Sequence, residues 1–148
     1  MAKENVHGTA LVVGDRGVLI TGPSGSGKTT LALALIAREA AAGRFARLVG
    51  DDQLFVEALG GRLVVACPPT ISGVAEVYGI GPWPQPHLAS AVIDLVVRLV
   101  PRANAPRLGE PQTETIAGVS LPAIDLPARS VEACRLVLGA WFDGSPER

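Results

Sequence analysis

The sequence predicts a single α/β domain in which a mixed β-sheet is flanked by helices. Short apolar runs of strand length alternate with two longer helical patterns along the 148 residues. One run, Val18 to Ile20, leads through a glycine-rich loop into the helix-forming stretch Thr30 to Ile36. With 48% hydrophobic and 18% charged residues, the chain has a globular composition and room for a substantial core. No repeat or linker divides it, so we expect one domain over residues 1–148.

The first half of the chain is expected to place several strands around one helix. Turn residues at Asp15-Arg16-Gly17 and at Gly60-Gly61 each separate two apolar runs, which is typical of β-hairpins. Gly43 follows the helical pattern as a C-cap residue would. In chain order, the expected elements are strands at 6–14 and 18–21, a helix to about residue 42, a strand at 45–49 that ends at Gly50-Asp51-Asp52, and hairpin strands at 54–59 and 62–66.

The second half is less regular. Residues 73–81 are interrupted by glycine and are expected to form a loop with a strand-like piece, and residues 82–86 a rigid proline-rich loop. Residues 89–100 are apolar throughout, so their pattern fits a strand or a helix. Residues 115–126 indicate two short strands around Gly118 and Pro122. Ser130 is expected to cap a terminal amphipathic helix that ends at Phe142.

The glycine-rich loop fits the phosphate-binding pattern G-x-x-x-x-G-K-[ST] at every specified position. Such a loop points backbone N–H groups at a phosphate, and the N-terminus of the following helix adds partial positive charge. Lys28 is placed to reach the β- and γ-phosphates, and the Thr29 hydroxyl to ligate Mg²⁺. The predicted nucleotide-binding residues are Gly22, Pro23, Ser24, Gly25, Ser26, Gly27, Lys28, Thr29 and Thr30.

Bulk charge and hydropathy exclude several classes of partner. The net charge of −1 gives no electrostatic reason to expect a nucleic acid. No apolar run is long enough for a membrane span, and the first residues lack the apolar core of a signal peptide. Cys67 and Cys134 lie far apart without metal-ligand spacing, which favours two small buried side chains. A cytoplasmic protein is therefore expected.

Two adjacent acids follow the predicted strand at 45–49. Asp51 and Asp52 lie where a Walker-B carboxylate would, so one is a candidate Mg²⁺ ligand and the other a candidate base for an attacking hydroxyl. His7 begins the first predicted strand. If that strand lies beside the loop-bearing strand, His7 approaches the Asp51 region, where it could orient a carboxylate base.

Several segments resemble the catalytic domain of HPr kinase/phosphorylase. They run from His7 to Val12, from Gly17 to Thr29 and from Leu48 to Asp52. Three later segments are similar to further family motifs: 76–81 to E-x-R-G-x-G, 106–109 to D-R-L-G, and 121–129 to a hydrophobic-Pro-Val-Arg stretch. The resemblance covers residues 7–129 and only the catalytic domain, as in the shortened members of the family. It implies a P-loop-containing fold of the PEP carboxykinase-like, HPr kinase type.

The resemblance also implies a reaction. A serine of HPr, a small phosphocarrier protein, is phosphorylated with ATP or pyrophosphate and Mg²⁺, and inorganic phosphate removes that phosphoryl group again. By resemblance, Asp51 is the base in one direction and the acid in the other, with His7 influencing its protonation. Thr29, Asp52 and Glu76 would hold Mg²⁺, while Arg107 would be the cation beside the transferring phosphate. A homo-oligomer, a hexamer by resemblance, is implied as well.

Two positions depart from the family pattern. Tyr78 stands where the signature has Arg, which removes a positive charge, and Thr30 stands where many members carry an acid. Two alternatives therefore remain beside the serine kinase/phosphorylase. One is a nucleotide-binding sensor or regulator with little catalysis. The other is a small-metabolite kinase, although the arginines from Arg98 to Arg107 are too interrupted by proline for an arginine-rich lid.

Overall fold

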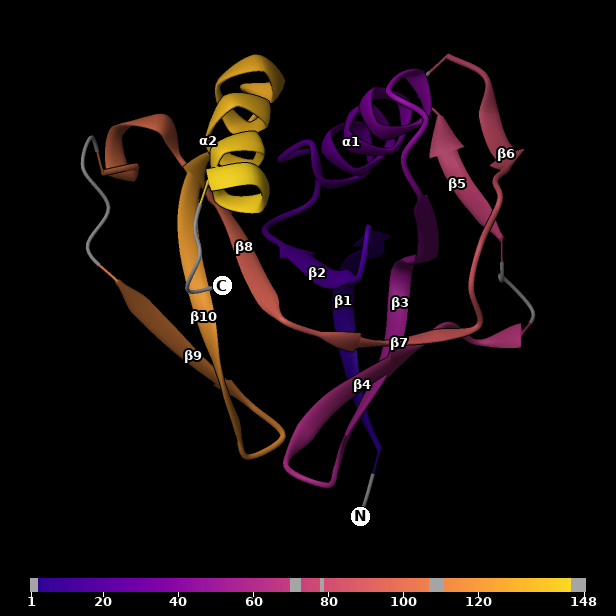
Figure 1. Ribbon diagram of the computed structural model, residues 1–148, viewed down its shortest axis with the longest axis vertical. Helices are drawn as coiled ribbons and strands as arrows, with labels where there is room; N and C mark the ends of the chain where they lie inside the picture. The colour runs from indigo at the N-terminus through magenta and orange to yellow at the C-terminus, as the bar shows by residue number, and fades with distance from the viewer. Residues whose placement is uncertain (1–2, 70–72, 78, 107–110, 145–148) are drawn as a thin grey trace.

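In the described part of the computed structural model, eight strands form one mixed sheet, and two helices pack on it (Figure 1). The structure describes residues 3–69, 73–77, 79–106 and 111–144. The strand order is β7-β4-β3-β1-β2-β8-β10-β9. The bounds are β1 (Glu4–Val13), β2 (Arg16–Thr21), β3 (Ala46–Leu59), β4 (Arg62–Ala66), β7 (Ser90–Ile93), β8 (Leu95–Val100), β9 (Gln112–Ile116) and β10 (Val119–Pro127). This confirms the predicted α/β class with a mixed sheet.

The remaining elements lie around this sheet. The helices are α1 (Lys28–Ala41) and α2 (Val131–Gly144), and a 3₁₀ turn, η2 (Arg102–Asn104), follows β8. A separate two-stranded antiparallel sheet pairs β5 (Val74–Val77) with β6 (Gly81–Pro84). Figure 1 shows α1 and α2 side by side above the curled sheet, with β5 and β6 beyond α1.

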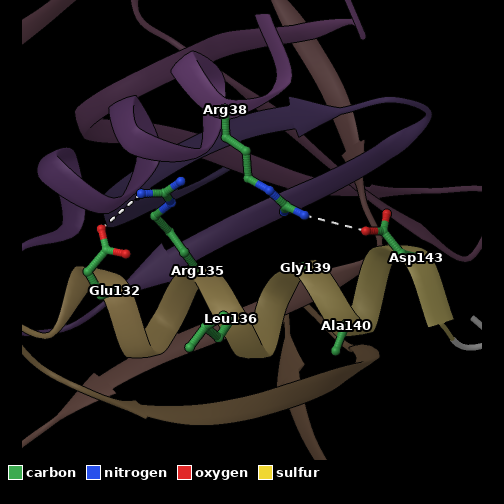
Figure 2. Close-up of a pocket in the computed structure, with 7 residues that line it drawn as sticks. All are labelled: Arg38, Glu132, Arg135, Leu136, Gly139, Ala140 and Asp143. Atoms are coloured by element: carbon green, nitrogen blue, oxygen red, sulfur yellow. Dashed lines mark hydrogen bonds and ion pairs between the residues drawn. The ribbon is translucent and has the colours of Figure 1, made fainter. Parts of the chain in front are cut away.

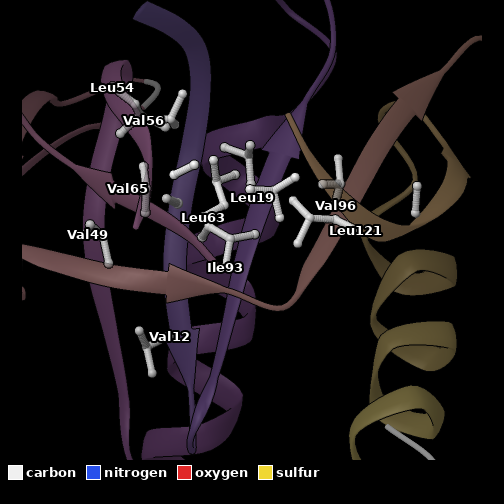
Figure 3. Close-up of a cluster of buried hydrophobic side chains, with 14 residues drawn as sticks. Val12, Leu19, Val49, Leu54, Val56, Leu63, Val65, Ile93, Val96 and Leu121 are labelled. Atoms are coloured by element: carbon white, nitrogen blue, oxygen red, sulfur yellow. The ribbon is translucent and has the colours of Figure 1, made fainter. Parts of the chain in front are cut away.

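The sheet buries side chains on both faces. Because side chains alternate along a strand, Leu11 and Val13 of β1 pack toward the helices, whereas Ala10 and Val12 pack on the opposite face. The helix side also contains Leu31 and Leu35 of α1 and Leu138 of α2. On the opposite face the curled sheet packs on itself, as the cluster in Figure 3 shows.

This double burial explains the ambiguous pattern at residues 89–100. In β8, Leu95 and Val97 belong to the helix-side cluster and Val96 to the opposite one, so both faces are apolar and no alternation appears. The segment is two strands, with the break at Asp94. The backbone N–H of Asp94 donates to the Gly17 carbonyl (2.8 Å), and its carboxylate accepts from the Gly17 N–H (2.9 Å). Asp94 thereby links the turn between β7 and β8 to the start of β2.

Several element boundaries differ from expectation. The predicted break at Gly50-Asp51-Asp52 is wrong, because β3 continues through it and pairs with β1 along its length. The proline-rich segment is not simply a loop, since β6 ends at Pro84. Pro122 does not interrupt β10, where it lies opposite Thr113 of the edge strand β9. The prediction of two strands around Gly118 is confirmed, since β9 ends before it and β10 begins after it.

The two helices begin and end close to their predicted bounds. Gly43 has φ 72°, and its N–H donates to the carbonyl of Ala40 in the last turn of α1. Ser130 directly precedes α2, as predicted. Its hydroxyl, however, donates to the Ala128 carbonyl (3.2 Å) and accepts from Arg102 (2.9 Å), so this side chain ties strand ends together.

Candidate functional site

Three parallel strands end at one edge of the sheet and position the glycine-rich loop. β2 and β10 each pair in parallel with β8, so residues that follow their carboxyl ends lie near one another. β2 leads into residues 22–27, β8 into η2, and β10 into the short connection to α2. Crevices at the carboxyl ends of parallel strands are the usual ligand sites of open α/β sheets.

The loop from Gly22 to Thr29 has the backbone shape that its glycines permit. Gly25 and Gly27 have φ values of 79° and 98°, in the left-handed region that favours glycine. Gly27 is the N-cap of α1, so the positive end of the helix dipole lies at the loop. The Lys28 ammonium group donates to the carbonyls of Gly22 (2.8 Å) and Pro23 (3.1 Å). The ammonium therefore lies along the first part of the loop.

Asp51 lies against the start of α1. Its Oδ1 accepts a hydrogen bond from Thr29 Oγ1 (2.8 Å) and a second from Thr9 Oγ1 (2.7 Å). Thr9 lies directly opposite Asp51 in the β1–β3 pairing, and both residues are buried. The carboxylate is thus held by hydroxyl groups from two different elements, next to the glycine-rich loop.

Asp52 points elsewhere and contacts His7. The imidazole Nε2 of His7 pairs with Asp52 Oδ1, and both side chains are half exposed or more. Asp52 has φ 78°, an uncommon conformation for a residue other than glycine. Near it, the register between β1 and β3 shifts after the Ala10–Gly50 pair, so Val49 is the extra residue of a β-bulge. Bulges beside active sites redirect side chains, and here adjacent acids reach separate partners.

The donor set beside the loop fits Mg²⁺. Thr29 Oγ1 and Asp51 Oδ1 are hard oxygen donors 2.8 Å apart, and protein Mg²⁺ sites usually combine one or two carboxylates with phosphate and water oxygens. Within the described part of the chain, no three His, Cys, Asp or Glu side chains gather into a metal site of their own. The residues therefore suit an ion shared with a phosphate ligand better than a dedicated protein cage.

The remaining predicted site residues lie on β5 or outside the described residues. Glu76 lies on β5, opposite Pro82 of β6. Arg107 and Tyr78 lie outside the described residues. The guanidinium of Arg98 is already paired with two acids: it donates to Asp125 Oδ1 (2.5 Å) and to Glu114 Oε1 (3.3 Å). Hydrogen bonding to Asp125 raises the pKa of Arg98, so this arginine remains charged within a network of sheet residues.

Two residues at the site were not predicted from the sequence. Thr9 lies within the segment from His7 to Val12, and Arg129 ends the segment 121–129, but no role was expected for either residue. The first contacts Asp51, and the second contacts the glycine-rich loop. Neither has a local sequence signal, since both contacts depend on which strands are neighbours.

A separate pocket of about 360 Å³ lies between α1 and α2 (Figure 2). Arg38 and Arg135 point into it from the two helices. Each is paired with an acid of α2: Arg38 with Asp143 (3.4 Å) and Arg135 with Glu132 (2.9 Å). None of its lining residues was among the predicted site residues.

Comparison with known protein families identifies the fold and the family. The model of the HPr serine kinase C-terminal domain matches residues 1–141. The chain belongs to this family. The HPr kinase/phosphorylase of Lactobacillus acidophilus is 35% identical over 142 residues, which is 87% of this chain and 42% of that protein. That of Clostridium tetani is 39% identical over 92 residues, or 61% of this chain and 28% of its own length.

A solved structure supports the same assignment. The Hpr(Ser) kinase/phosphatase from Coxiella burnetii superposes with a TM-score of 0.79 at 28% identity, covering 94% of this chain and 88% of that one. The chain nevertheless spans only about two fifths of the length of a curated relative such as the L. acidophilus protein. Among the residues that the structure describes, no helix has the length and apolar character needed to cross a bilayer.

Proposed function

We propose that this chain transfers a phosphoryl group to a serine of a phosphocarrier protein similar to HPr, using ATP or pyrophosphate with Mg²⁺. The observation that supports this most strongly is the contact of Asp51 with Thr29 beside the glycine-rich loop. It supports the proposal because a carboxylate, a hydroxyl and the N-terminus of α1 lie next to one another, and a base, a metal ligand and a phosphate-binding helix end are what this reaction needs. The family membership supports the same reaction class.

In the proposed forward direction, Asp51 accepts the proton of the serine hydroxyl as its oxygen attacks the terminal phosphorus of the donor. The bond from that phosphorus to the bridging oxygen breaks, and ADP or inorganic phosphate leaves. Thr9 and Thr29 hold the carboxylate at the point of attack. Lys28 and the loop N–H groups orient the donor phosphates. Bound Mg²⁺ would neutralise charge on the phosphate oxygens.

In the proposed reverse direction, an oxygen of inorganic phosphate attacks the phosphorus of phosphoserine. Asp51 returns its proton to the serine oxygen, and pyrophosphate is released. Asp52 follows Asp51 in the sequence, and its partner His7 lies on the neighbouring strand β1. The family resemblance assigns to His7 an influence on Asp51, and we carry this role over as part of the proposal. We assign the remaining predicted roles, Mg²⁺ binding by Asp52 and Glu76 and phosphate binding by Arg107, as proposals on the family resemblance.

The decisive experiment is serine phosphorylation by the purified chain. HPr, Mg²⁺ and either ATP or pyrophosphate are incubated with the chain, phosphoserine is measured by mass spectrometry, and inorganic phosphate is then added to look for reversal. Replacing Asp51 by Asn should lower the transfer rate by about 100-fold or more, because a positioned base contributes roughly that factor. Asp15→Asn is the matched control, since the Asp15 side chain is 96% exposed in a turn. Transfer by Asp51→Asn at the rate of the unmodified chain would rule out its role as the base.

A regulator with little catalysis is the second candidate, favoured by Tyr78 in place of the family arginine. It predicts that ATP or pyrophosphate binds while no donor yields phosphoserine. Titration of both ligands alongside the transfer assay separates the two functions.

A further inference from the structure

Arg129 contacts the glycine-rich loop from outside, on the connection between β10 and α2. Its backbone N–H donates to the Ser26 carbonyl (2.9 Å), and its side-chain Nε donates to the Gly25 carbonyl (2.7 Å). One residue therefore holds two consecutive carbonyls of the loop. A Cβ added to Gly25 would meet Arg129 Nη2 at 3.2 Å, so glycine at this position permits the close approach of the guanidinium.

These two contacts orient the peptide units of the loop. In a trans peptide the carbonyl and the following N–H point in opposite directions. With the carbonyls of Gly25 and Ser26 held toward Arg129, the N–H groups of Ser26 and Gly27 turn to the other side. The Ser26 N–H donates across the loop to the Pro23 carbonyl (3.1 Å), which closes the turn, so the Gly27 N–H is the group turned toward an incoming ligand. Orienting it before the ligand arrives removes a cost of binding.

Arg129 has a backbone conformation that is unfavourable for a residue with a side chain. Its φ is 55°, in the left-handed region where glycine or asparagine is usual. Such outliers persist where the surrounding structure holds them, and they cluster at ligand sites. Here the two hydrogen bonds to the loop supply that restraint.

The guanidinium also has no acidic partner among the residues that the structure describes. Arg129 is absent from the ion pairs found there, and so is Arg102, which donates to Ser130 Oγ (2.9 Å) at the same junction. Arg98, in contrast, is paired with Asp125. Arg129, held against the outer side of the loop, adds positive charge close to the anion site without an acid in the described part of the chain to neutralise it, and hydrogen bonds that involve a charged group are the stronger ones.

We propose that Arg129 is a positioning residue for the phosphate site: it sets the Gly25–Gly27 backbone for a pyrophosphate group and adds positive charge on the outer side of the loop. The ligand chemistry is pyrophosphate, free or as the β,γ-phosphates of a nucleoside triphosphate. The inference deepens the proposed function and rests on it. It also links β10 and α2 to the loop, because the same residue joins all three.

The test measures binding of magnesium pyrophosphate by calorimetry to the unmodified chain and to R129Q, R129K and R102Q. We expect R129Q to weaken the Kd by about tenfold or more, as loss of a charge-assisted contact and of loop order would. R129K keeps the charge but loses the planar guanidinium, so it should recover only part of the affinity. R102Q, which removes a neighbouring charge without touching the loop, should stay within about twofold of the unmodified chain.

Amide hydrogen exchange provides the readout that distinguishes positioning from charge alone. Exchange at residues 25–27 should accelerate in R129Q while the N–H groups of β1 and β3 keep their protection. R129Q binding within about twofold of the unmodified chain, or R102Q losing as much affinity as R129Q, overturns the proposal. So does failure of the unmodified chain to bind magnesium pyrophosphate. Loss of affinity in R129Q without any phosphoserine formation by the unmodified chain supports the role of Arg129 and refutes the proposed kinase reaction instead.

Discussion

At the scale of single residues, adjacent acids take different partners. Asp51 is held by Thr9 and Thr29 beside the glycine-rich loop, while Asp52 turns to His7 at the surface. The left-handed φ of Asp52 and the β-bulge at Val49 lie on either side of Asp51. The pair of acids therefore separates into an inner, buried carboxylate and an outer, exposed one, which suits different chemical roles.

Removing the Thr9 hydroxyl tests whether it positions Asp51. Thr9→Val keeps the shape but deletes the hydroxyl through which Thr9 donates to Asp51 Oδ1. A hydrogen bond to a charged group contributes about 1.5–3 kcal/mol, so we expect serine phosphorylation to slow by about tenfold or more. Thr9→Ser, which restores the hydroxyl, should recover most of the rate. Equal rates for the valine variant and the unmodified chain would show that the Thr9 hydroxyl is not needed to position Asp51.

At the scale of elements, a polar network joins the three strands on one side of the sheet. Arg98 of β8 lies opposite Asp125 of β10 in the parallel register, and it also reaches Gln112 and Glu114 of β9. The side chains of Arg98 and Asp125 are 26% and 22% exposed, so neither charge is fully hydrated. This network fixes the β8–β10 pairing that brings Arg129 to the loop.

Breaking the network should destabilise the fold. Asp125→Ala leaves a partly buried guanidinium with fewer acceptors, so we expect the free energy of unfolding in urea to fall by about 1–3 kcal/mol. Glu132→Ala is the matched control, because Glu132 is 82% exposed and its pair with Arg135 lies on the helix surface. That substitution should change stability by less than about 0.5 kcal/mol. Similar losses in both variants would mean that the network has no special role.

At the scale of the whole molecule, one curled sheet forms two cores that share its central strands. β1, β2 and β8 bury side chains on both faces, toward the helices and toward the folded-over part of the sheet. Both free cysteines are buried. Cys134 belongs to the helix-side cluster, and Cys67 packs closely against Gly50 of β3. Burial raises the pKa of both thiols above the ordinary value of 9.0.

The cysteines give a pH-dependent signature of the intact fold. Because the folded state favours the neutral thiols, their contribution to stability is fully present below pH 9.0 and is lost as the pH rises above it. We expect the free energy of unfolding to decline as the pH rises above 9.0, and to decline less steeply in the Cys67→Ala, Cys134→Ala double variant. Iodoacetamide should label both thiols slowly in the native protein and rapidly in urea. Fast native labelling of either cysteine would contradict its burial.

Local signals in the sequence were sufficient for much of the fold. The strand, glycine-rich loop and helix from Val18 onward, and the hairpin at Gly60-Gly61, depend on residues close in the chain, so their patterns predict them. The break predicted at Gly50-Asp51-Asp52 was wrong, because pairing with β1 outweighs the local turn tendency of Gly and Asp. Residues 89–100 stayed ambiguous because burial on both faces removes the periodicity that separates strand from helix.

The glycine-rich loop, the candidate residues around it and the family resemblance can all be recognised in the sequence, because contiguous motifs carry them. Which of these residues meet follows from the way the sheet folds. The β1–β3 register places Thr9 at Asp51, and the parallel order of β2, β8 and β10 brings Arg129 to the loop. Such contacts join residues 42 and 104 positions apart. They depend on strand order and register, which are set by the packing of the whole sheet.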